Sequence, residues 1–418
     1  MTVVAPPRAR LLLLLPTTTY RADAFVDAAK FLRLDLTVAS ELPSAFQDEH
    51  PADLLTLDLG NPDAAVTAAR AFAQHHPLRG VVGVDDDTAV VAACIAGDLG
   101  LPCNPLAAVR AARDKQLQRE RLHAGGVPIP PFAVHTLDEH ARAVAESVSY
   151  PCVLKPVSLS GSRGVIRADD PDAFVTAHAR LGAILKAAEL PHDENRFLVE
   201  RYVPGPEYAL EGIVVDGALH VLAVFDKPDP LDGPFFEETI YVTPSRAGDD
   251  TLRSLTQCAQ QAVTALGLER GPVHIELRHN EEGPWLIEIA ARPIGGKCGR
   301  TLRFGPDGDI SLETVVLRQV VEPGTAVPPR ETQAAGVMMI PIPYQGVLRG
   351  VDGAVKARAV PGVEDVVITA HSGQVVVPLP EGSRYLGFIF ARGETPAFVE
   401  EALRAAHATL EPRIDPPD

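Results

Sequence analysis

Two glutamates, Glu276 and Glu288, interrupt apolar runs in the stretch VHIELRHNEEGPWLIEIA. The stretch reads as two strands joined at Gly283-Pro284, and a turn centred near Glu282 places the two acids opposite each other on one face. Opposed carboxylates destabilise a sheet unless one of them is protonated or a cation lies between them. Carboxylate oxygens suit Mg²⁺, so Glu276 and Glu288 are candidate metal ligands.

Side-chain alternation gives this predicted hairpin two different faces. His274 and Arg278 share the face of Glu276, whereas the odd-numbered residues are apolar and should pack in the core. These residues are Ile275, Leu277, Trp285, Ile287 and Ile289. A shifted register, with both acids solvated on an exposed face, is the alternative that spacing leaves open.

Glycine and serine residues follow a lysine in VLKPVSLSGSRGV. A short strand delivers Lys155, and the loop with Ser160, Gly161, Ser162 and Gly164 offers an anion backbone N–H groups and hydroxyl donors. The sequence is neither a Walker A motif nor G-x-G-x-x-G, and a flexible hairpin loop explains it equally well.

Two further segments carry charged residues beside apolar runs. Lys115 in AARDKQLQRE lies on a predicted helix, where a solvated charged face explains it without a ligand. In FLVERYVPGPEY one strand enters Glu200 and the next begins at Glu207. Chain reversal at Pro204-Gly205-Pro206 accounts for most of that pattern.

The elements that must position these residues fall in three segments. Residues 1–105 alternate apolar strands with amphipathic helices, which predicts a Rossmann-like domain with a parallel sheet. Residues 106–325 open with a helix that ends at Gly125-Gly126 and continue with strands and helices. The Pro-rich segment EPGTAVPPRETQ is a predicted linker into an α+β domain over 326–418, whose last helix has Thr395 as the expected N-cap.

Composition excludes several classes of function. The 418 residues carry a formal net charge of −17 without a Lys/Arg run, so no nucleic-acid partner is expected. Five scattered cysteines form no C-x-x-C pair, which favours a reduced, cytoplasmic setting without a disulfide framework. No run reaches transmembrane length, so no membrane partner is expected, and RARLLLLLP reads as a buried first strand rather than a signal peptide.

Taken in order, RDK, LKPVSLSGSRGV, FLVERYVPGPEY, VHIELR and LIEIAARPIGG resemble the ATP-grasp superfamily. The resemblance covers all three segments and is most specific over residues 110–300. It implies an α/β chain in which a Rossmann-like domain (1–105) precedes an ATP-grasp domain of two α+β subdomains (106–325) and an α+β C-terminal domain (326–418). It also implies ATP as the nucleotide and Mg²⁺ as the metal, with Mn²⁺ as an alternative.

The resemblance implies nucleotide contacts from several segments. Lys115 and Lys155 would hold ATP phosphates, the loop from Ser158 to Gly164 would close over them, and Glu207 would bind the ribose hydroxyls. The strand from Glu200 to Val203 would meet adenine. The full set is Lys115, Lys155, Ser160, Gly161, Ser162, Gly164, Glu200, Tyr202, Val203 and Glu207.

The resemblance also explains why an acid-bearing strand runs into a guanidinium and two glycines. Glu276 and Glu288 would hold the metal, and Arg292, the expected catalytic residue, would face the reacting phosphoryl and carboxylate groups. Gly295 and Gly296 would let backbone N–H groups approach the substrate carboxylate, although a plain turn accounts for this pair as well.

The implied activity is carboxylate activation. A carboxylate oxygen attacks the γ-phosphoryl group of ATP, and an amine then displaces phosphate from the acylphosphate. The C-terminal PLPEGSRYLGFIFARG is similar to L-amino acid ligases, which favours an amide formed from an amino acid. We therefore expect small-molecule carboxylate and amine substrates. A homodimer is one alternative for the assembly of the chain.

Two other activities and one candidate loop complete these expectations. A biotin-carboxylase-like enzyme would need a bicarbonate site, and no A-M-K-M biotinylation segment is present. An inactive nucleotide-binding protein is supported only by Ala290, which stands where many members carry a metal-ligating Asn.

The segment DKPDPLDGPFFEETIYVTPSR is a candidate substrate loop or an exposed acidic connection. Its candidate contacts are Phe235, Phe236, Glu237 and Glu238.

Overall fold

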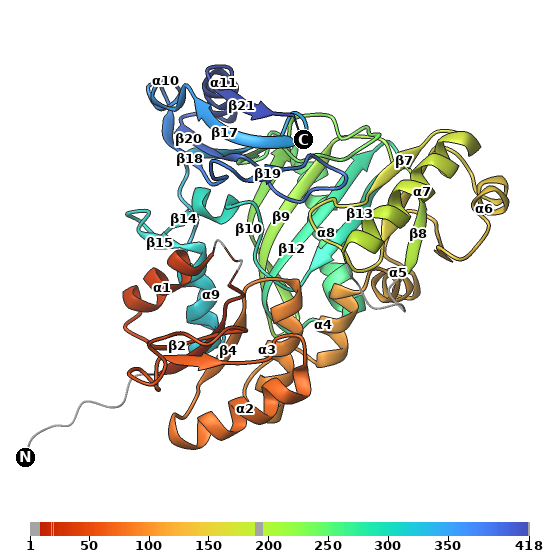
Figure 1. The fold of residues 1–418 in the computed structure, drawn as a ribbon. Coiled ribbons are helices and arrows are strands. Elements are labelled where there is room, and N and C mark those ends of the chain that lie inside the picture. The colour runs from red at the N-terminus through yellow and green to blue at the C-terminus, as the bar shows by residue number, and fades with distance from the viewer. Residues whose placement is uncertain (1–8, 18, 20, 189–194, 417–418) are drawn as a thin grey trace, which may run out of the picture.

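Residues 9–17, 19, 21–188 and 195–416 are described by the structure, a computed structural model (Figure 1). The first part is a parallel sheet, as predicted, and its strand order is β3-β2-β1-β4. Leu11 and Leu13 pack into one apolar cluster and Leu12 and Leu14 into another, so β1 is a strand buried on both faces. Its elements are β1 (Arg10–Leu14), α1 (Ala22–Phe31), β2 (Asp35–Ser40), β3 (Leu54–Thr56), α2 (Pro62–His75), β4 (Gly80–Gly83) and α3 (Asp86–Asp98).

A small antiparallel sheet, in order β5-β8-β6-β7, projects to the right in Figure 1. Phe174 and Leu181 of α7 are fully buried against it, which explains the apolar spacing of that helix. The sheet presents Lys155 at the end of one strand and Glu200 on its neighbour. Its elements are β5 (Phe132–Thr136), α6 (Ala141–Ser147), β6 (Cys152–Pro156), β7 (Ile166–Ala168), α7 (Pro171–Ala187) and β8 (Arg196–Arg201).

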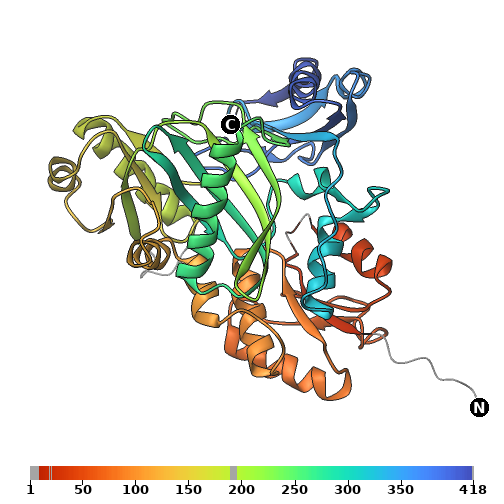
Figure 2. The same ribbon diagram turned by 180° about the vertical axis from the view of Figure 1, so that it is seen from behind.

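The central sheet has the order β13-β12-β9-β10-β11-β16-β20-β18. Figure 2 shows α8 (Asp249–Leu266) across one face, where its apolar side packs on β9, β12 and β13. The strands are β9 (Glu207–Val215), β10 (Ala218–Lys227), β11 (Ile240–Thr243), β12 (Arg270–Asn280), β13 (Gly283–Ala290), β16 (Ala334–Ile340), β18 (Val363–Ile368) and β20 (Gly387–Gly393).

The central sheet continues across residue 325, where the sequence suggested a domain boundary. β11 pairs with β16, although α8, β12, β13, several shorter elements and an irregular segment over residues 322–333 separate them in the chain. The ranges 106–325 and 326–418 stay a prediction about domain limits, but they do not separate two sheets. The elements between β13 and β16 are η2 (Cys298–Thr301), β14 (Arg303–Phe304), β15 (Ile310–Ser311) and α9 (Leu312–Val321).

The C-terminal part covers the end of the central sheet with a second sheet, in order β19-β17-β21. Thr395 caps the last helix as predicted, because its hydroxyl accepts a hydrogen bond from the Phe398 backbone N–H at 3.2 Å. The remaining elements are β17 (Gly346–Asp352), α10 (Ala354–Arg358), β19 (Val375–Val376), α11 (Pro396–His407) and β21 (Glu411–Asp415).

The single helix predicted around Lys115 is two helices, α4 (Leu106–Arg113) and α5 (Lys115–Ala124). Asp114 has an extended backbone and accepts a hydrogen bond from the Leu117 N–H at 2.9 Å, so it caps α5. The break turns α5 so that Lys115 and Arg119 face the interior, and the predicted solvated face is wrong at both positions. No helix among the described residues is long and apolar enough to cross a membrane.

The hairpin of β12 and β13 pairs Glu276 directly with Glu288, as predicted. A bulge after Glu276 shifts the remaining pairs by one residue, so that Leu277 faces Leu286. The fully buried apolar residues of the hairpin are Val273, Ile275, Leu277, Leu286 and Ile289. Trp285 and Ile287 are only half-buried, which corrects the predicted core face, and the turn lies at Glu281-Glu282 rather than at Gly283-Pro284.

Candidate active site

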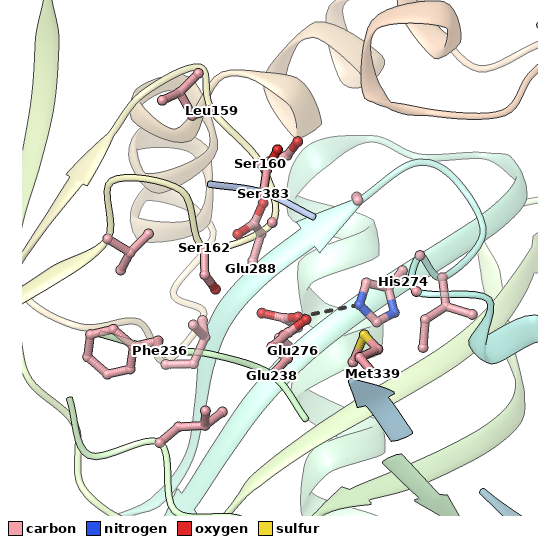
Figure 3. Close-up of a pocket in the computed structure, with 18 of the residues that line it drawn as sticks. Leu159, Ser160, Ser162, Phe236, Glu238, His274, Glu276, Glu288, Met339 and Ser383 are labelled. Atoms are coloured by element: carbon pink, nitrogen blue, oxygen red, sulfur yellow. Dashed lines mark ion pairs between the residues drawn. The ribbon is translucent and has the colours of Figure 1, made fainter. Parts of the chain in front are cut away.

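A cavity of about 750 Å³ lies where the small sheet, the central sheet and the two terminal parts of the chain meet (Figure 3). All of the nucleotide, metal and substrate residues that the resemblance implied, except Gly164, line it. They are Lys115, Lys155, Ser160, Gly161, Ser162, Glu200, Tyr202, Val203, Glu207, Glu276, Glu288, Arg292, Gly295 and Gly296.

Gly164 was a predicted nucleotide contact, but it does not line the cavity. Its backbone N–H donates to Pro380 O at 2.9 Å, which joins the loop to the C-terminal part. At the tip of the loop, Gly161 and Ser162 have φ values of +63° and +57°. A non-glycine residue in this region is uncommon, and such residues occur in turns and cluster at ligand sites and switch regions.

Lys155 is fixed by a buried network around Glu200. Glu200 accepts from Arg119 Nε at 2.6 Å and lies 2.8 Å from Lys155 Nζ. Burial would raise the pKa of Glu200, but the two cations outweigh it and hold the pKa at about 2. Two cations against one carboxylate leave one positive charge beside the cavity.

Tyr202 and Val203, which follow the end of β8, are held by separate contacts. Tyr202 Oη donates to Asp232 Oδ1 at 2.7 Å, and the Arg167 guanidinium lies 4.2 Å from the Tyr202 ring centroid. The backbone carbonyl of Val203 accepts from Arg278 Nη1 at 2.7 Å. These contacts hold Tyr202 and Val203, which the resemblance places beside adenine, in the wall of the cavity.

The two opposed glutamates each lie beside a lysine ammonium group, and the two lysines belong to different elements. Lys115 Nζ lies 3.2 Å from Glu288 Oε1 and also donates to Leu159 O at 2.8 Å. Glu276 Oε1 lies 3.1 Å from Nζ of Lys227. Each carboxylate therefore has one ammonium group beside it, and the metal between them stays a prediction. Lys227 was not among the residues predicted from the sequence.

Lys227 sits among three carboxylates whose oxygens lie within 4.8 Å of one another, those of Glu207, Glu238 and Glu276. Its Nζ is 2.7 Å from Glu207, 2.6 Å from Glu238 and 3.1 Å from Glu276. Burial, together with the charge of Glu276, raises the pKa of Glu238 to about 7 although Lys227 opposes the shift. The pKa of Glu276 is held below its ordinary value by Lys227 and His274 in spite of burial.

His274 joins Glu276 to a second buried acid (Figure 3). Its Nε2 lies 3.5 Å from Glu276 Oε1, and its Nδ1 lies 3.4 Å from Glu211 Oε2 without hydrogen-bond geometry. Burial would lower the pKa of His274, but the two carboxylates raise it to about 9. The imidazole therefore adds positive charge to the floor of the cavity at neutral pH.

Arg292 is oriented by the N-terminal part of the chain. Its Nε lies 2.8 Å from Asp86 Oδ1, at the start of α3. Burial would raise the pKa of Asp86, but Arg292 first, and then Lys115, lower it. Sequence reasoning missed Asp86 because nothing in the first segment resembles a ligand-binding motif.

The segment after Arg292 is clamped from both sides. Arg21 donates to Ile294 O at 2.7 Å, and the Ile294 N–H donates to Glu211 at 3.1 Å. Gly296 has a φ of +59°, and a Cβ placed there would lie 2.6 Å from Met339 Sδ. Glycine therefore avoids both the strain of a left-handed backbone and a shift of the Met339 side chain at this position.

Only two of the four candidate residues in the predicted substrate loop line the cavity. Phe236 and Glu238 line the cavity, whereas Phe235 packs under the Arg180 guanidinium, 4.5 Å from the ring centroid. Burial raises the pKa of Glu237, which does not line the cavity.

Family models match three parts of the chain. They are an ATP-grasp N-terminal domain over residues 26–103, an ATP-grasp domain over 148–301 and L-amino acid ligase C-terminal domain 2 over 338–415. The chain belongs to the ATP-grasp superfamily, and its C-terminal domain is of the L-amino acid ligase type.

Known proteins of the same kind resemble the chain over different lengths. The crystal structure of L-amino acid ligase from Bacillus licheniformis matches with a TM-score of 0.82 and 26% identity, over 97% of this chain and 99% of that chain. Alanine–anticapsin ligase from Bacillus subtilis (strain 168) is 32% identical over 216 residues, which are 47% of this chain and 44% of the relative. Carnosine synthase 1 from Gallus gallus is 31% identical over 280 residues, 63% of this chain and 30% of the relative. The chain thus spans less than half of the length of these two curated relatives.

Proposed function

We propose that this chain is an ATP-dependent ligase that activates a carboxylate as an acylphosphate and joins it to an amine. We propose further that an amino acid supplies at least one of these groups. The observation that carries the proposal is the gathering of lysines, a paired-glutamate hairpin, Arg292 and a glycine-bearing turn around one cavity of about 750 Å³. The L-amino acid ligase C-terminal match supports the amino acid.

The nucleotide phosphates would be held by Lys115, Lys155 and the loop from Ser160 to Ser162. The surplus positive charge of the Glu200 network supports this role, because Lys155 is buried, oriented and directed at the cavity. The positive φ values of Gly161 and Ser162 support a ligand-binding loop, since such backbone conformations cluster at ligand clamps and switch regions.

Glu276 and Glu288 fit a divalent cation, because their oxygens are hard donors on directly paired residues of one hairpin. Mg²⁺, or Mn²⁺ with the same donors, would neutralise charge on the phosphate oxygens. Both carboxylates now lie beside lysine ammonium groups, and a cation between them would compete with those contacts. Ala290 lines the cavity without a ligating atom, which favours one metal ion unless Glu288 bridges two.

The chain's other groups would position and neutralise the reacting parts. Arg292, oriented through Nε by Asp86, would bind the carboxylate and the developing charge on the acylphosphate. Backbone N–H groups at Gly295 and Gly296 would receive the substrate carboxylate. Glu238, with its pKa raised to about 7, would take the proton that the attacking amine must lose.

The proposal is tested by ADP release from Mg·ATP with a panel of amino acids, offered singly and in pairs, and with bicarbonate as a separate arm. We expect ADP and an amide with at least one amino-acid pair, and neither with Glu288→Gln at an unchanged melting temperature. ADP release that depends on bicarbonate alone would support a carboxylase instead. Absence of ADP with every pair, or full activity of Glu288→Gln, would overturn the proposal.

A further inference from the structure

In the part of the chain that the structure describes, some of the lysine and arginine side chains around the cavity form ion pairs with carboxylates, and one does not. Lys115, Lys155, Arg278 and Arg292 each lie within 3.2 Å of a carboxylate oxygen. Arg201, at the rim, is also 3.2 Å from Glu282. These contacts orient the side chains but neutralise part of the charge that anionic substrates require.

Arg384 is different. It lines the same cavity from the C-terminal part, and its side chain is exposed. Within the described residues, it forms neither a hydrogen bond nor an ion pair, so its full positive charge faces the open space. An arginine fork without a protein acceptor is suited to a carboxylate or phosphate that arrives with a ligand.

The backbone that carries Arg384 is hydrogen-bonded to the loop from Ser158 to Gly164, which we call the glycine-serine loop. Pro380 O accepts from the Gly164 N–H at 2.9 Å, and Glu381 O accepts from Arg163 Nε at 3.0 Å. The Glu381 carboxylate also pairs in bidentate fashion with Arg180 of α7, at 2.5 and 2.9 Å. We call residues 380–384 the docking segment.

A tight turn makes the docking segment rigid. The Gly382 N–H donates to Pro378 O at 2.9 Å, and a Cβ at Gly382 would lie only 1.9 Å from Val377 O. Two residues later, Arg384 leaves this turn toward the cavity, and the next residue, Tyr385, packs against the apolar cluster beneath it. The position of Arg384 is therefore set by the contacts with the glycine-serine loop and α7.

We propose that Arg384 is an anion-binding residue which the docking segment delivers to the cavity, where it receives an anionic oxygen group of a substrate. That group is either the carboxylate of an amino acid or the phosphate transferred from the nucleotide. The inference rests on the proposed function for the identity of the substrates, but not for the presence of the anion site.

The test is calorimetric titration of the full chain loaded with Mg·ADP. The probes are inorganic phosphate and a panel of L-amino acids, each matched with its carboxamide, which lacks the negative charge. The variants are Arg384→Ala and Arg384→Lys. The control is Arg413→Ala, since Arg413 is an exposed arginine of the same part of the chain that pairs with Asp352 and does not line the cavity.

We expect Arg384→Ala to weaken binding of one anion class by about tenfold or more, the scale of a lost hydrogen bond to a charged group. Arg384→Lys should lie between Arg384→Ala and the wild type, and Arg413→Ala should match the wild type. A loss confined to phosphate assigns Arg384 to the phosphoryl group. A loss with free amino acids but not with their carboxamides assigns it to the carboxylate.

Equal affinities of wild type and Arg384→Ala for both anion classes would overturn the inference, as would failure of the wild type to bind either anion. The two proposals can fail separately. If no amino-acid pair releases ADP but phosphate binding depends on Arg384, the proposed function fails and the anion site stands. If ADP is released and Arg384→Ala alters nothing, only the anion site fails.

Discussion

At the scale of single residues, Arg292 has two possible roles that the Asp86 contact now separates. A guanidinium fixed by one carboxylate is preorganised for an acylphosphate, so it should matter more to the transition state than to nucleotide binding. Arg292→Ala should lower kcat by about a hundredfold or more while ATP affinity changes little. Arg292→Lys should also be poor, because an ammonium group lacks the planar fork.

The competing role is structural, with Arg292 only joining α3 to the end of β13 through Asp86. In that case Arg292→Ala and Asp86→Asn should lower the melting temperature alike and regain normal kcat in the cold. Measurement of kcat, ATP affinity and melting temperature on both variants distinguishes the roles. A loss of stability with normal kcat at low temperature would contradict the catalytic assignment.

Glu200 gives the protein a dependence of stability on acid pH. Its pKa falls from an ordinary 4.5 to about 2, so in this range the unfolded chain binds more protons than the folded one. The stabilisation is complete above pH 4.5 and is lost as the pH falls toward 2. The shift corresponds to about 3 kcal/mol.

Urea unfolding of wild type and Glu200→Gln at a series of pH values measures this contribution. The difference in unfolding free energy between the two proteins should shrink as the pH drops below 4.5. The variant should be less stable at neutral pH, because Arg119 and Lys155 keep their buried charges without a partner. A difference that is independent of pH would show that Glu200 is not ionised in the folded state.

The sequence predicted the Glu276–Glu288 pair because alternation and a short turn define the register, but it missed Lys227 for a specific reason. The Asp216-Gly217 turn is a hairpin signal, and β9 pairs with β10 around it. Regular pairing from that turn would set Glu207 opposite Asp226. A bulge between Val221 and Ala223 moves Lys227 there instead, and such a bulge has no clear sequence signature.

At the scale of elements, the glycine-serine loop should change its exposure with nucleotide. Its present contacts to the docking segment are few and lie at residues 163 and 164, while its tip faces the cavity. Loops over phosphates commonly close on ligand binding. Trypsin should therefore cut after Arg163 more slowly when a non-hydrolysable ATP analogue and Mg²⁺ are present.

Cleavage after Arg79, in an exposed connection before β4, is the internal control and should not change. Mass spectrometry of the fragments over time gives both rates from one digest. Equal cleavage after Arg163 with and without the analogue would contradict closure of this loop over the nucleotide.

The helix around Lys115 illustrates what element-scale patterns can and cannot predict. Gly125-Gly126 marked the end of the helix correctly, since α5 ends at Ala124. The break at Asp114 was not predicted, because Asp inside a charged stretch looks the same whether it caps a helix or faces solvent. With the break, Lys115 and Arg119 enter the interior, where Glu288 and Glu200 neutralise them.

At the scale of the whole molecule, the first sheet was predictable and the continuous central sheet was not. Parallel strands follow from alternating elements, and the first segment forms a parallel sheet of four strands. Pairing of β11 with β16 joins strands that are distant in sequence, and no local pattern specifies it. The same holds for Asp86, Arg21 and the docking segment, which reach the cavity only through tertiary packing.

The central claim is that a substrate carboxylate is activated by the transferred phosphoryl group. It is tested most directly by isotope transfer, using an amino-acid substrate whose carboxylate carries a heavy oxygen isotope. In an acylphosphate route one carboxylate oxygen leaves with the phosphate, so the phosphate released with ADP should carry the label in proportion to the amide formed. Amide formation with unlabelled phosphate, or with AMP in place of ADP, would contradict the account.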